Sequence, residues 1–305
     1  MRVIICLKLM LLVLLVNGCS SPKHKNPRLK KADLYYSQGS SELLHGDYTN
    51  SLKHLIKANT LDPDNTKILN NLGMAYYFKG EKTLAKKNLK KALDVDKQNS
   101  DARNNLASIY LKMGKYSLAE QEYKKIRSHL TYSKQFRVLF NMATISLKRN
   151  RISEAMERLN LSLNDKKDFC PAHLLLGNIH YKNRDYKNAY KSYVKASLTT
   201  CYSYPIPHYK QAVTLIKLGE YMRAKDKLNH LIKKHPDTRF SKLAREKLAN
   251  LTPRVILGLD KIGKHTIHDE ILELPEESVK TGSPMAGNKL GLKKKNKTLF
   301  ITPTF

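Results

Sequence analysis

The chain has 305 residues and is 41% hydrophobic, which suffices for one large or two modest domains with buried cores. Its formal net charge is +30 at pH 7, a balance that suits nucleic acid, anionic lipid or acidic protein as a partner. No RNP-type aromatic motif, zinc-ligand spacing or helix-turn-helix signature occurs, which argues against nucleic acid. The alternative is compositional drift toward Lys, a residue that simply keeps a surface soluble.

Residues 1–18 have the layout of a secretory signal peptide. The segment 1–8 carries Arg2 and Lys8 without an acidic residue, and an unbroken apolar stretch follows from Leu9 to Val16. This stretch is far shorter than the ~20 residues that a permanent membrane-spanning helix needs. We therefore expect export and cleavage.

The end of this segment, Val16-Asn17-Gly18-Cys19, resembles the bacterial lipobox, with Asn17 as a departure from the usual small or apolar residue. The resemblance implies cleavage before Cys19, a lipid thioether on its sulfur and palmitate-type acylation of its new amino group. Ser20 and Ser21 follow instead of Asp, which implies sorting to the periplasmic face of the outer membrane. The alternatives are an ordinary cleaved signal and a core cysteine.

Residues 19–31 form an expected basic linker. It contains Pro22, Pro27 and five Lys or Arg residues, so it should space the folded part from the membrane and favour anionic headgroups.

An internal repeat occupies residues 32–251. The segment "GDYTNSLKHLIKANTLDPDN" from Gly46 is similar to "GEKTLAKKNLKKALDVDKQN" from Gly80, and each such segment follows an apolar helical pattern such as "ILNNLGMAYYFKG". Small residues recur where two helices would cross closely, for example Gly73 and Ala85. The spacing between copies is 34 to 36 residues, and the copies begin near Ala32, Thr66, Ser100, Phe136, Cys170 and Pro205.

This pattern resembles the tetratricopeptide repeat (TPR). The resemblance implies an all-α fold, a right-handed superhelical solenoid of six helix hairpins. The early Trp or Tyr of the repeat is absent, and the later copies carry Leu69, Arg103, Leu139, His173 and His208 there. Arg239 to Leu251 is predicted to be a polar-faced capping helix, which a solenoid needs at its end.

Residues 252–305 lack any sustained period and are predicted to be a largely disordered basic tail. Its end, 293–305, joins a basic cluster to an apolar "LFITPTF". That end either has no role or adds a strand to a partner's sheet edge.

No motif of catalysis, dinucleotide binding or phosphate binding occurs, so we expect no enzyme activity, no cofactor and no small-molecule substrate. His265 and His268 lie three residues apart. They are either two of the ligands of a metal site or polar residues without that role. We predict no metal.

The surface of the first helices is the predicted peptide-binding groove, because the first helix of each repeat lines the concave face. Asn71, Asn105 and Asn141 occupy one equivalent position, and Asn offers both a donor and an acceptor to an extended peptide. The alternative is that Asn is merely tolerated on a helix surface. The full predicted groove consists of Asn70, Asn71, Met74, Tyr77, Asn104, Asn105, Ser108, Leu111, Phe140, Asn141, Thr144, Asn178, Tyr181 and Tyr209.

Cys170 and Cys201 are predicted to form a disulfide. Cys170 opens the first helix of the fifth copy and Cys201 follows the second, so both lie at the same end of an antiparallel hairpin. An exported chain would meet an oxidising compartment. The alternative is two separate buried thiols.

The combination of the lipobox, the short linker and six repeats resembles the pilotins of the type IV pilus, the PilF/PilW/Tgl group. The resemblance covers residues 1 to about 251, and the basic tail is not part of the pattern. It implies a protein that binds the secretin subunit and promotes its outer-membrane localisation and assembly. The alternative is another TPR adaptor, for outer-membrane protein insertion or for regulation of a cell-wall hydrolase.

Overall fold

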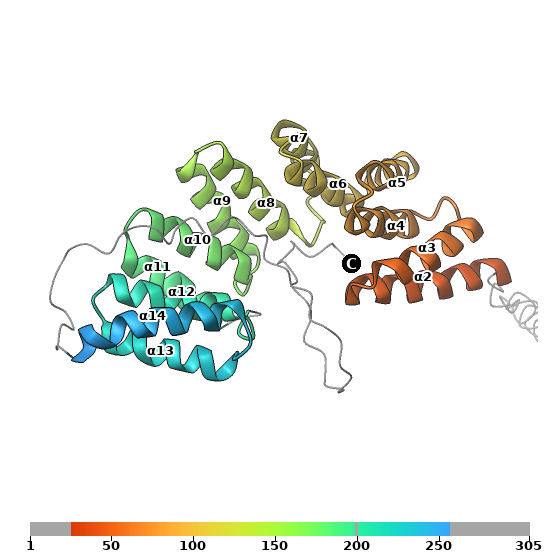
Figure 1. Cartoon of the computed structure of the whole chain (residues 1–305). Coiled ribbons are helices and arrows are strands. Elements are labelled where there is room, and N and C mark those ends of the chain that lie inside the picture. Colours follow the sequence, from red (N-terminus) through yellow and green to blue (C-terminus); the bar gives the residue numbers. More distant parts are fainter. Residues whose placement is uncertain (1–25, 199–200, 257–305) are drawn as a thin grey trace, which may run out of the picture. The chain divides into compact units, whose positions relative to one another are not determined.

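The computed structural model describes residues 26–198 and 201–256, and this part of the chain consists of helices joined by turns and short loops (Figure 1). It forms two compact units, which divide between Val95 and Asp96 and are described separately below. The predicted signal peptide, Cys19, most of the linker and the tail from residue 257 onward lie outside the described residues.

Each unit is a series of antiparallel helix hairpins, and six hairpins occur where the repeat predicted them. Four first helices begin at the predicted starts, and α8 begins one residue before Phe136. Unit 1 holds α2 (Pro27–His45) with α3 (Tyr48–Leu61), and α4 (Thr66–Lys79) with α5 (Lys82–Val95). Unit 2 holds α6 (Ser100–Lys112), α7 (Tyr116–Arg127), α8 (Gln135–Lys148), α9 (Ile152–Asp165), α10 (Cys170–Lys182), α11 (Tyr186–Ser197), α12 (Pro205–Lys217), α13 (Tyr221–Lys234) and α14 (Arg239–Ile256).

The first hairpin corrects the predicted linker. Helix α2 starts at Pro27, five residues before Ala32, because Asn26 caps it by accepting a hydrogen bond from the backbone N–H of Arg28. Proline at the first helical position needs no donor and has a suitable φ. Residues 27–31 are therefore helical.

The recurrent glycine of the repeat ends the first helix. Gly46, Gly80, Gly114 and Gly219 all have positive φ at the turn into the second helix, where glycine carries no steric cost. In the fourth and fifth hairpins the equivalent residues are Asn150 and Arg184, and they adopt the same left-handed conformation. The turn geometry is thus retained where the glycine is lost.

Within a hairpin the two helices approach closely at a small residue. A Cβ atom on Gly73 would lie 2.8 Å from Cγ of Leu89, and one on Gly177 would lie 2.5 Å from Cε1 of Tyr193. Both facing side chains are fully buried. The small residue of the first helix therefore sets the interhelical distance.

In three copies the residue that replaces the early Trp or Tyr of the repeat is polar and has the same role. His173 contacts the carbonyl oxygen of Lys167 at 2.8 Å, and His208 contacts that of Tyr202 at 2.9 Å. Arg103 likewise donates to the carbonyl oxygen of Lys97. In each case the polar side chain ties its helix to the loop six residues earlier.

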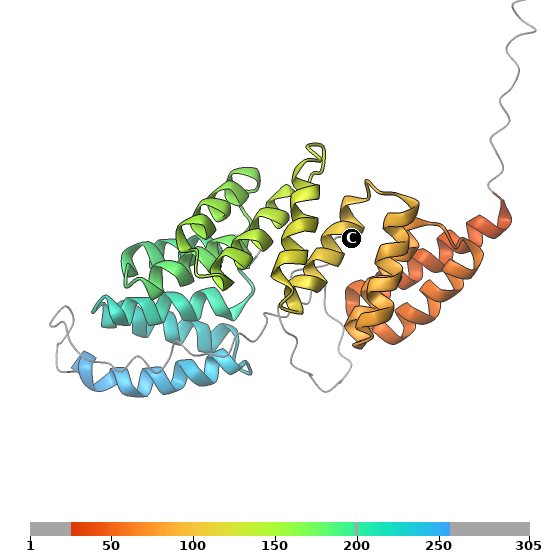
Figure 2. The same cartoon turned by 90° about the horizontal axis from the view of Figure 1, so that it is seen from above.

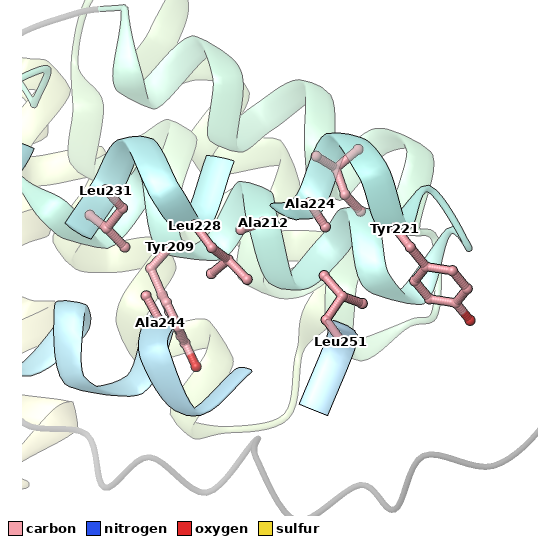
Figure 3. Close-up of a cluster of buried hydrophobic side chains, with 9 residues drawn as sticks. Tyr209, Ala212, Tyr221, Ala224, Leu228, Leu231, Ala244 and Leu251 are labelled. Carbon is pink, nitrogen blue, oxygen red and sulfur yellow. The ribbon is translucent and has the colours of Figure 1, made fainter. Parts of the chain in front are cut away.

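Helix α14 covers the last hairpin, as the capping prediction required. Ala244 and Leu251 of α14 pack with Tyr209 of α12 and with Leu228 and Leu231 of α13 (Figure 3). The view from above shows α14 running alongside α13 (Figure 2). The helix extends to Ile256, past the predicted end at Leu251.

In the structure Cys170 and Cys201 are joined by a disulfide, with their Cα atoms 5.8 Å apart. The bond links the start of α10 to the loop before α12. Both residues are buried.

Replacing Cys170 and Cys201 together by Ala should lower the free energy of unfolding by about 3–4 kcal/mol, because the bridge closes a loop of 31 residues in the unfolded chain. Urea unfolding measures the change, and reduced wild type should behave like the variant. Digestion of unreduced protein purified from an oxidising compartment should give a linked peptide pair. Two freely alkylated thiols would refute the pairing.

Stability should also fall on acidification. Burial lowers the pKa of His173 and of His208, so below about pH 6.5 the unfolded chain binds protons that the folded chain does not. The contribution of these residues is complete at neutral pH and is lost as the pH drops through their folded pKa values. Urea unfolding at pH 7.5 and 5.5 should show this loss, and replacing both by Gln should reduce it. An identical pH dependence in the double variant would contradict the account.

Candidate protein-binding face

The structure places the fourteen predicted groove residues on α4 of unit 1 and on α6, α8, α10 and α12 of unit 2, but most lie below the surface. Nine are buried and none is exposed. Those that remain half-buried are Tyr77, Ser108, Phe140, Thr144 and Asn178.

In unit 1 the predicted asparagines join neighbouring helices. The amide nitrogen of Asn71 donates to Oγ of Ser40 on α2 at 2.8 Å, and Asn70 donates to Oδ1 of Asn71 at 3.1 Å. Asn71 is 3% exposed. Its amide thus holds α4 against α2, a role that the sequence did not indicate.

In unit 2 an equivalent network connects three helices. Oγ of Ser108 on α6 lies 3.0 Å from the hydroxyl of Tyr123 on α7, and it accepts from the amide of Asn141 on α8 at 3.4 Å. Burial raises the pKa of Tyr123, although hydrogen bonding of its hydroxyl to Ser108 and to Asn141 acts in the lowering direction. The hydroxyl therefore stays protonated as a fixed structural group.

Two buried tyrosines on second helices of unit 2 share one arrangement. Tyr193 on α11 donates to Oδ1 of Asn178 on α10 at 2.9 Å, fifteen residues apart like Tyr123 and Ser108. Where the second helix carries Leu159 instead, the first helix has Thr144, whose hydroxyl bonds the carbonyl of its own helix at Phe140. Tyr123 and Tyr193 thus each have a polar partner in the first helix of their hairpin.

Some buried oxygen atoms of this region have no hydrogen-bond partner within the described residues. They include Oδ1 of Asn104, Oδ1 of Asn141 and the hydroxyl of Tyr209. Tyr209 is 1% exposed because α14 covers it, with Phe240 at a ring distance of 5.6 Å. Its predicted place on an open groove is corrected by this cover.

Lys210 is a residue of this region that the sequence analysis missed. It occupies on α12 the repeat position of Asn71, Asn105 and Asn141, and the register alone identifies it. Its side chain is half-buried with Nζ 6.0 Å from the ring centre of Tyr181, and burial lowers its pKa. We define the half-buried Ser108, Phe140, Thr144, Asn178 and Lys210 as the first-helix face of unit 2.

The side chains of the first-helix face are of the kinds that bind another molecule through apolar contacts and hydrogen bonds. It combines one apolar ring, two hydroxyls, an amide and a cation on the first helices of successive hairpins. Over the described residues no group of three or more His, Cys, Asp or Glu side chains is placed to hold a metal ion. No helix in the described segments is long and apolar enough to cross a membrane.

Comparison with protein families identifies the repeat. Tetratricopeptide repeat models match residues 66–99, 83–130 and 208–238. No curated protein sequence matches the chain. These matches identify tetratricopeptide repeats in two parts of the chain, and the six helix hairpins of the structure fit the same repeat.

Solved structures share this fold. The structure of pilF from Pseudomonas aeruginosa is 20% identical, with a TM-score of 0.61, and the match covers 73% of this chain and all of that one. PilW, a widely conserved type IV pilus biogenesis factor, is 15% identical with the same TM-score, over 70% of this chain and 97% of that one. The Cut9–Hcn1 hetero-tetramer of the APC/C also matches, at 15% identity and a TM-score of 0.61, over 75% of this chain and 44% of that one.

The chain therefore contains tetratricopeptide repeats, and its fold is similar to those of PilF and PilW. At these identities the likeness concerns the fold, which the Cut9–Hcn1 assembly shares. Proteins of this architecture bind protein partners on the extended surface of their stacked helices and are typically non-catalytic scaffolds.

A double-mutant cycle measures how much the hydrogen bond between Ser108 and Tyr123 contributes to the free energy of unfolding. Tyr123→Phe and Ser108→Ala should each lower the free energy of unfolding by about 1 kcal/mol, because each removes a buried hydrogen bond. Combined, they should cost less than the sum of the two, since they share one interaction. Strict additivity in urea unfolding would show that the contact contributes nothing.

Proposed function

We propose that this protein is a lipid-anchored periplasmic TPR protein of the outer membrane that binds the type IV pilus secretin subunit and promotes its localisation and assembly. The observation that carries the proposal is the fold match to PilW, a type IV pilus biogenesis factor, over 97% of that chain. The match to pilF over its whole length and the lipobox at Cys19 support it.

The first-helix face supplies a physical basis for binding a secretin segment. The ring of Phe140 and the stem of Lys210 offer apolar area, and Ser108 and Asn178 add a hydroxyl and an amide on the first helices of their own hairpins. Since the asparagines Asn71 and Asn141 already join helices, a partner would contact mainly these half-buried side chains. The rigid stack presents them without a folding cost, which favours affinity.

A second function, that of an adaptor for outer-membrane protein insertion or for a cell-wall hydrolase, is favoured by the extra chain beyond the shared fold. The match to pilF leaves 27% of this chain uncovered. A tail after the solenoid would give such an adaptor a further attachment point.

Binding should depend on the first helices and not on the second helices. Thr144→Arg, on α8, should weaken the affinity for the secretin subunit at least tenfold, because a long charged side chain would occupy the face. Asn160→Arg on α9 adds the same charge at an exposed position of the same hairpin and should leave the affinity unchanged. Titration calorimetry with purified secretin subunit measures both.

Two outcomes of this titration would contradict the proposal. If wild-type protein does not bind the secretin subunit, the partner is wrong. If Thr144→Arg binds as wild type does, contact occurs elsewhere on the chain. Circular dichroism and urea unfolding of both variants control for loss of the fold.

Lipidation of Cys19 should place the protein in the membrane fraction. Labelled palmitate should be incorporated into the wild type and not into Cys19→Ala, and this variant should become soluble in the periplasm because its acyl chains are lost. Cys6→Ala, in the segment before the predicted cleavage site, is the matched control and should still be labelled. An unlabelled wild type would end the lipoprotein hypothesis.

A further inference from the structure

The second helices of unit 1 are rich in cations. Helices α3 and α5 both pack against α4 (Figure 1). Two lysines lie on α3 and five on α5, and the only acidic residue in either helix is Asp94. Neither helix contains an arginine. The solvent-facing sides of these two helices are therefore strongly positive.

Five of these lysines have charges that no other group of the fold neutralises. We call them the basic face of unit 1: Lys53, Lys57, Lys86, Lys87 and Lys90. Lys86 is half-buried and the other four are exposed. Within the described residues, none of the five side chains has an ion-pair or hydrogen-bond partner, and Lys57 alone lies over a ring, with Nζ 5.3 Å from the ring centre of Tyr35. These charges are available to a partner.

The acidic side chains nearest to this face are engaged with other groups. Glu42 on α2 contacts His54 at 2.8 Å, and Asp64, in the loop after α3, pairs with Lys91 at 3.2 Å. Lys91 occupies the repeat position of Lys57 on α5, and this pair is the reason for leaving it out of the basic face. The described part of unit 1 thus places no carboxylate within ion-pair distance of the face.

The arrangement of these lysines disfavours the helices that carry them. Lys53 and Lys57 are four residues apart, as are Lys86 and Lys90, and like charges at this spacing repel each other on a helix surface. The first turn of α5 contains no acidic residue and its last turn no basic residue, which is the reverse of what the helix dipole favours. Since the charge does not stabilise the fold, it points to an anionic partner outside the chain.

Two second helices of unit 2 show that the repeat itself does not require this charge. On α7, Glu122 pairs with Lys125 at 2.8 Å, and Glu120 pairs with Lys124 at 3.7 Å. On α9, Glu154 likewise pairs with a cation of its own helix. The cations of α7 and α9 are therefore partly balanced by acids, whereas those of the basic face are not.

The side chains of the basic face indicate the class of partner. Lysine is a compact, hydrated point charge without the paired geometry of arginine, so it suits a surface with diffuse negative charge. Exposed apolar side chains lie among the lysines. Ile56 is three residues from Lys53 and Leu84 is three residues from Lys87, a spacing that makes neighbours on a helix surface. Cations with interspersed apolar groups are typical of surfaces that bind an anionic membrane interface.

We propose that the basic face of unit 1 binds the anionic phospholipid headgroups of a membrane surface. This binding stands on the charge, exposure and composition of the face. The orientation that would follow rests on the proposed function, namely on the lipid anchor. Helix α2 begins at Pro27, only eight residues after Cys19, so an acyl anchor would hold unit 1 close to the bilayer. The first-helix face of unit 2 has no role in this contact.

Flotation with lipid vesicles tests the binding without the anchor. The full chain carrying Cys19→Ala, which cannot be acylated there, is mixed with phosphatidylcholine vesicles that contain either no anionic lipid or about one third phosphatidylglycerol. Partition onto the anionic vesicles should be at least tenfold stronger than onto the neutral ones. Addition of 0.5 M NaCl should remove most of this difference, because salt screens exposed charges.

A variant of the basic face shows whether these lysines make the contact. Lys53→Gln, Lys87→Gln and Lys90→Gln, combined in the Cys19→Ala chain, change three exposed positions on α3 and α5. The partition onto anionic vesicles should fall at least tenfold, because each lysine near an anionic surface adds to the attraction. Circular dichroism and urea unfolding should show an intact fold.

Helix α11 supplies the matched control. Lys187, Lys191 and Lys195 are exposed on this second helix and also lack ion pairs within the described residues. Replacing all three by Gln removes the same net charge, yet the partition should stay within twofold of the parent chain. The preceding second helix, α9, exposes Glu157 and Asp165, which would repel an anionic surface beside α11.

Several results would overturn the proposal. These are equal partition onto neutral and anionic vesicles, equal losses from the two triple variants, or no loss from the variant of the basic face. If that variant instead loses affinity for the secretin subunit while its partition is unchanged, the face binds a protein and not lipid. A wild type that is not labelled by palmitate overturns the proposed anchor and the orientation, and it leaves the vesicle result valid.

Discussion

The close approach of two helices at a small residue is the constraint on which every hairpin of this protein depends. Gly39 faces Leu55, and Gly177 faces the ring of Tyr193, at distances that leave no room for a Cβ atom. Because first and second helices meet there, the side chains on either side of the crossing interlock, and the same residue positions recur at the repeat period. The turns and helix caps are compatible with this close packing. Most of the turns contain a glycine with positive φ, and where the glycine is absent Arg184 adopts a positive φ in its place.

The same constraint decides which polar groups enter the interior. When the second helix supplies Tyr123 or Tyr193 in place of leucine, a hydroxyl is buried beside the first helix and requires a partner. Ser108 and Asn178 supply it, and Asn141 extends the bond to the next repeat. One side of each first helix therefore packs against neighbouring helices. Only a few half-buried groups remain available to a partner.

The regular features of the fold could be predicted from the sequence because they follow from local periodicity. The starts of α4, α6, α10 and α12 and the proximity of Cys170 to Cys201 are of this kind. The start at Pro27 was missed because an Asn–Pro cap looks like a linker when it is read beside basic residues. The division at Val95 was missed because the repeat period continues through it. The inward orientation of Asn71 and Asn141 depends on partners a full repeat away, Ser40 and Ser108, which periodicity does not pair.

Hydrogen–deuterium exchange of the full chain with and without the secretin subunit tests the central claim most directly, namely that a protein partner binds the first-helix face. The account predicts added protection in α8 and α10 and unchanged exchange in α9 and α11, because the first helices carry the half-buried groups while the second helices only support them. Added protection confined to α9 and α11, or no change in any helix under conditions where the two proteins bind, would contradict it.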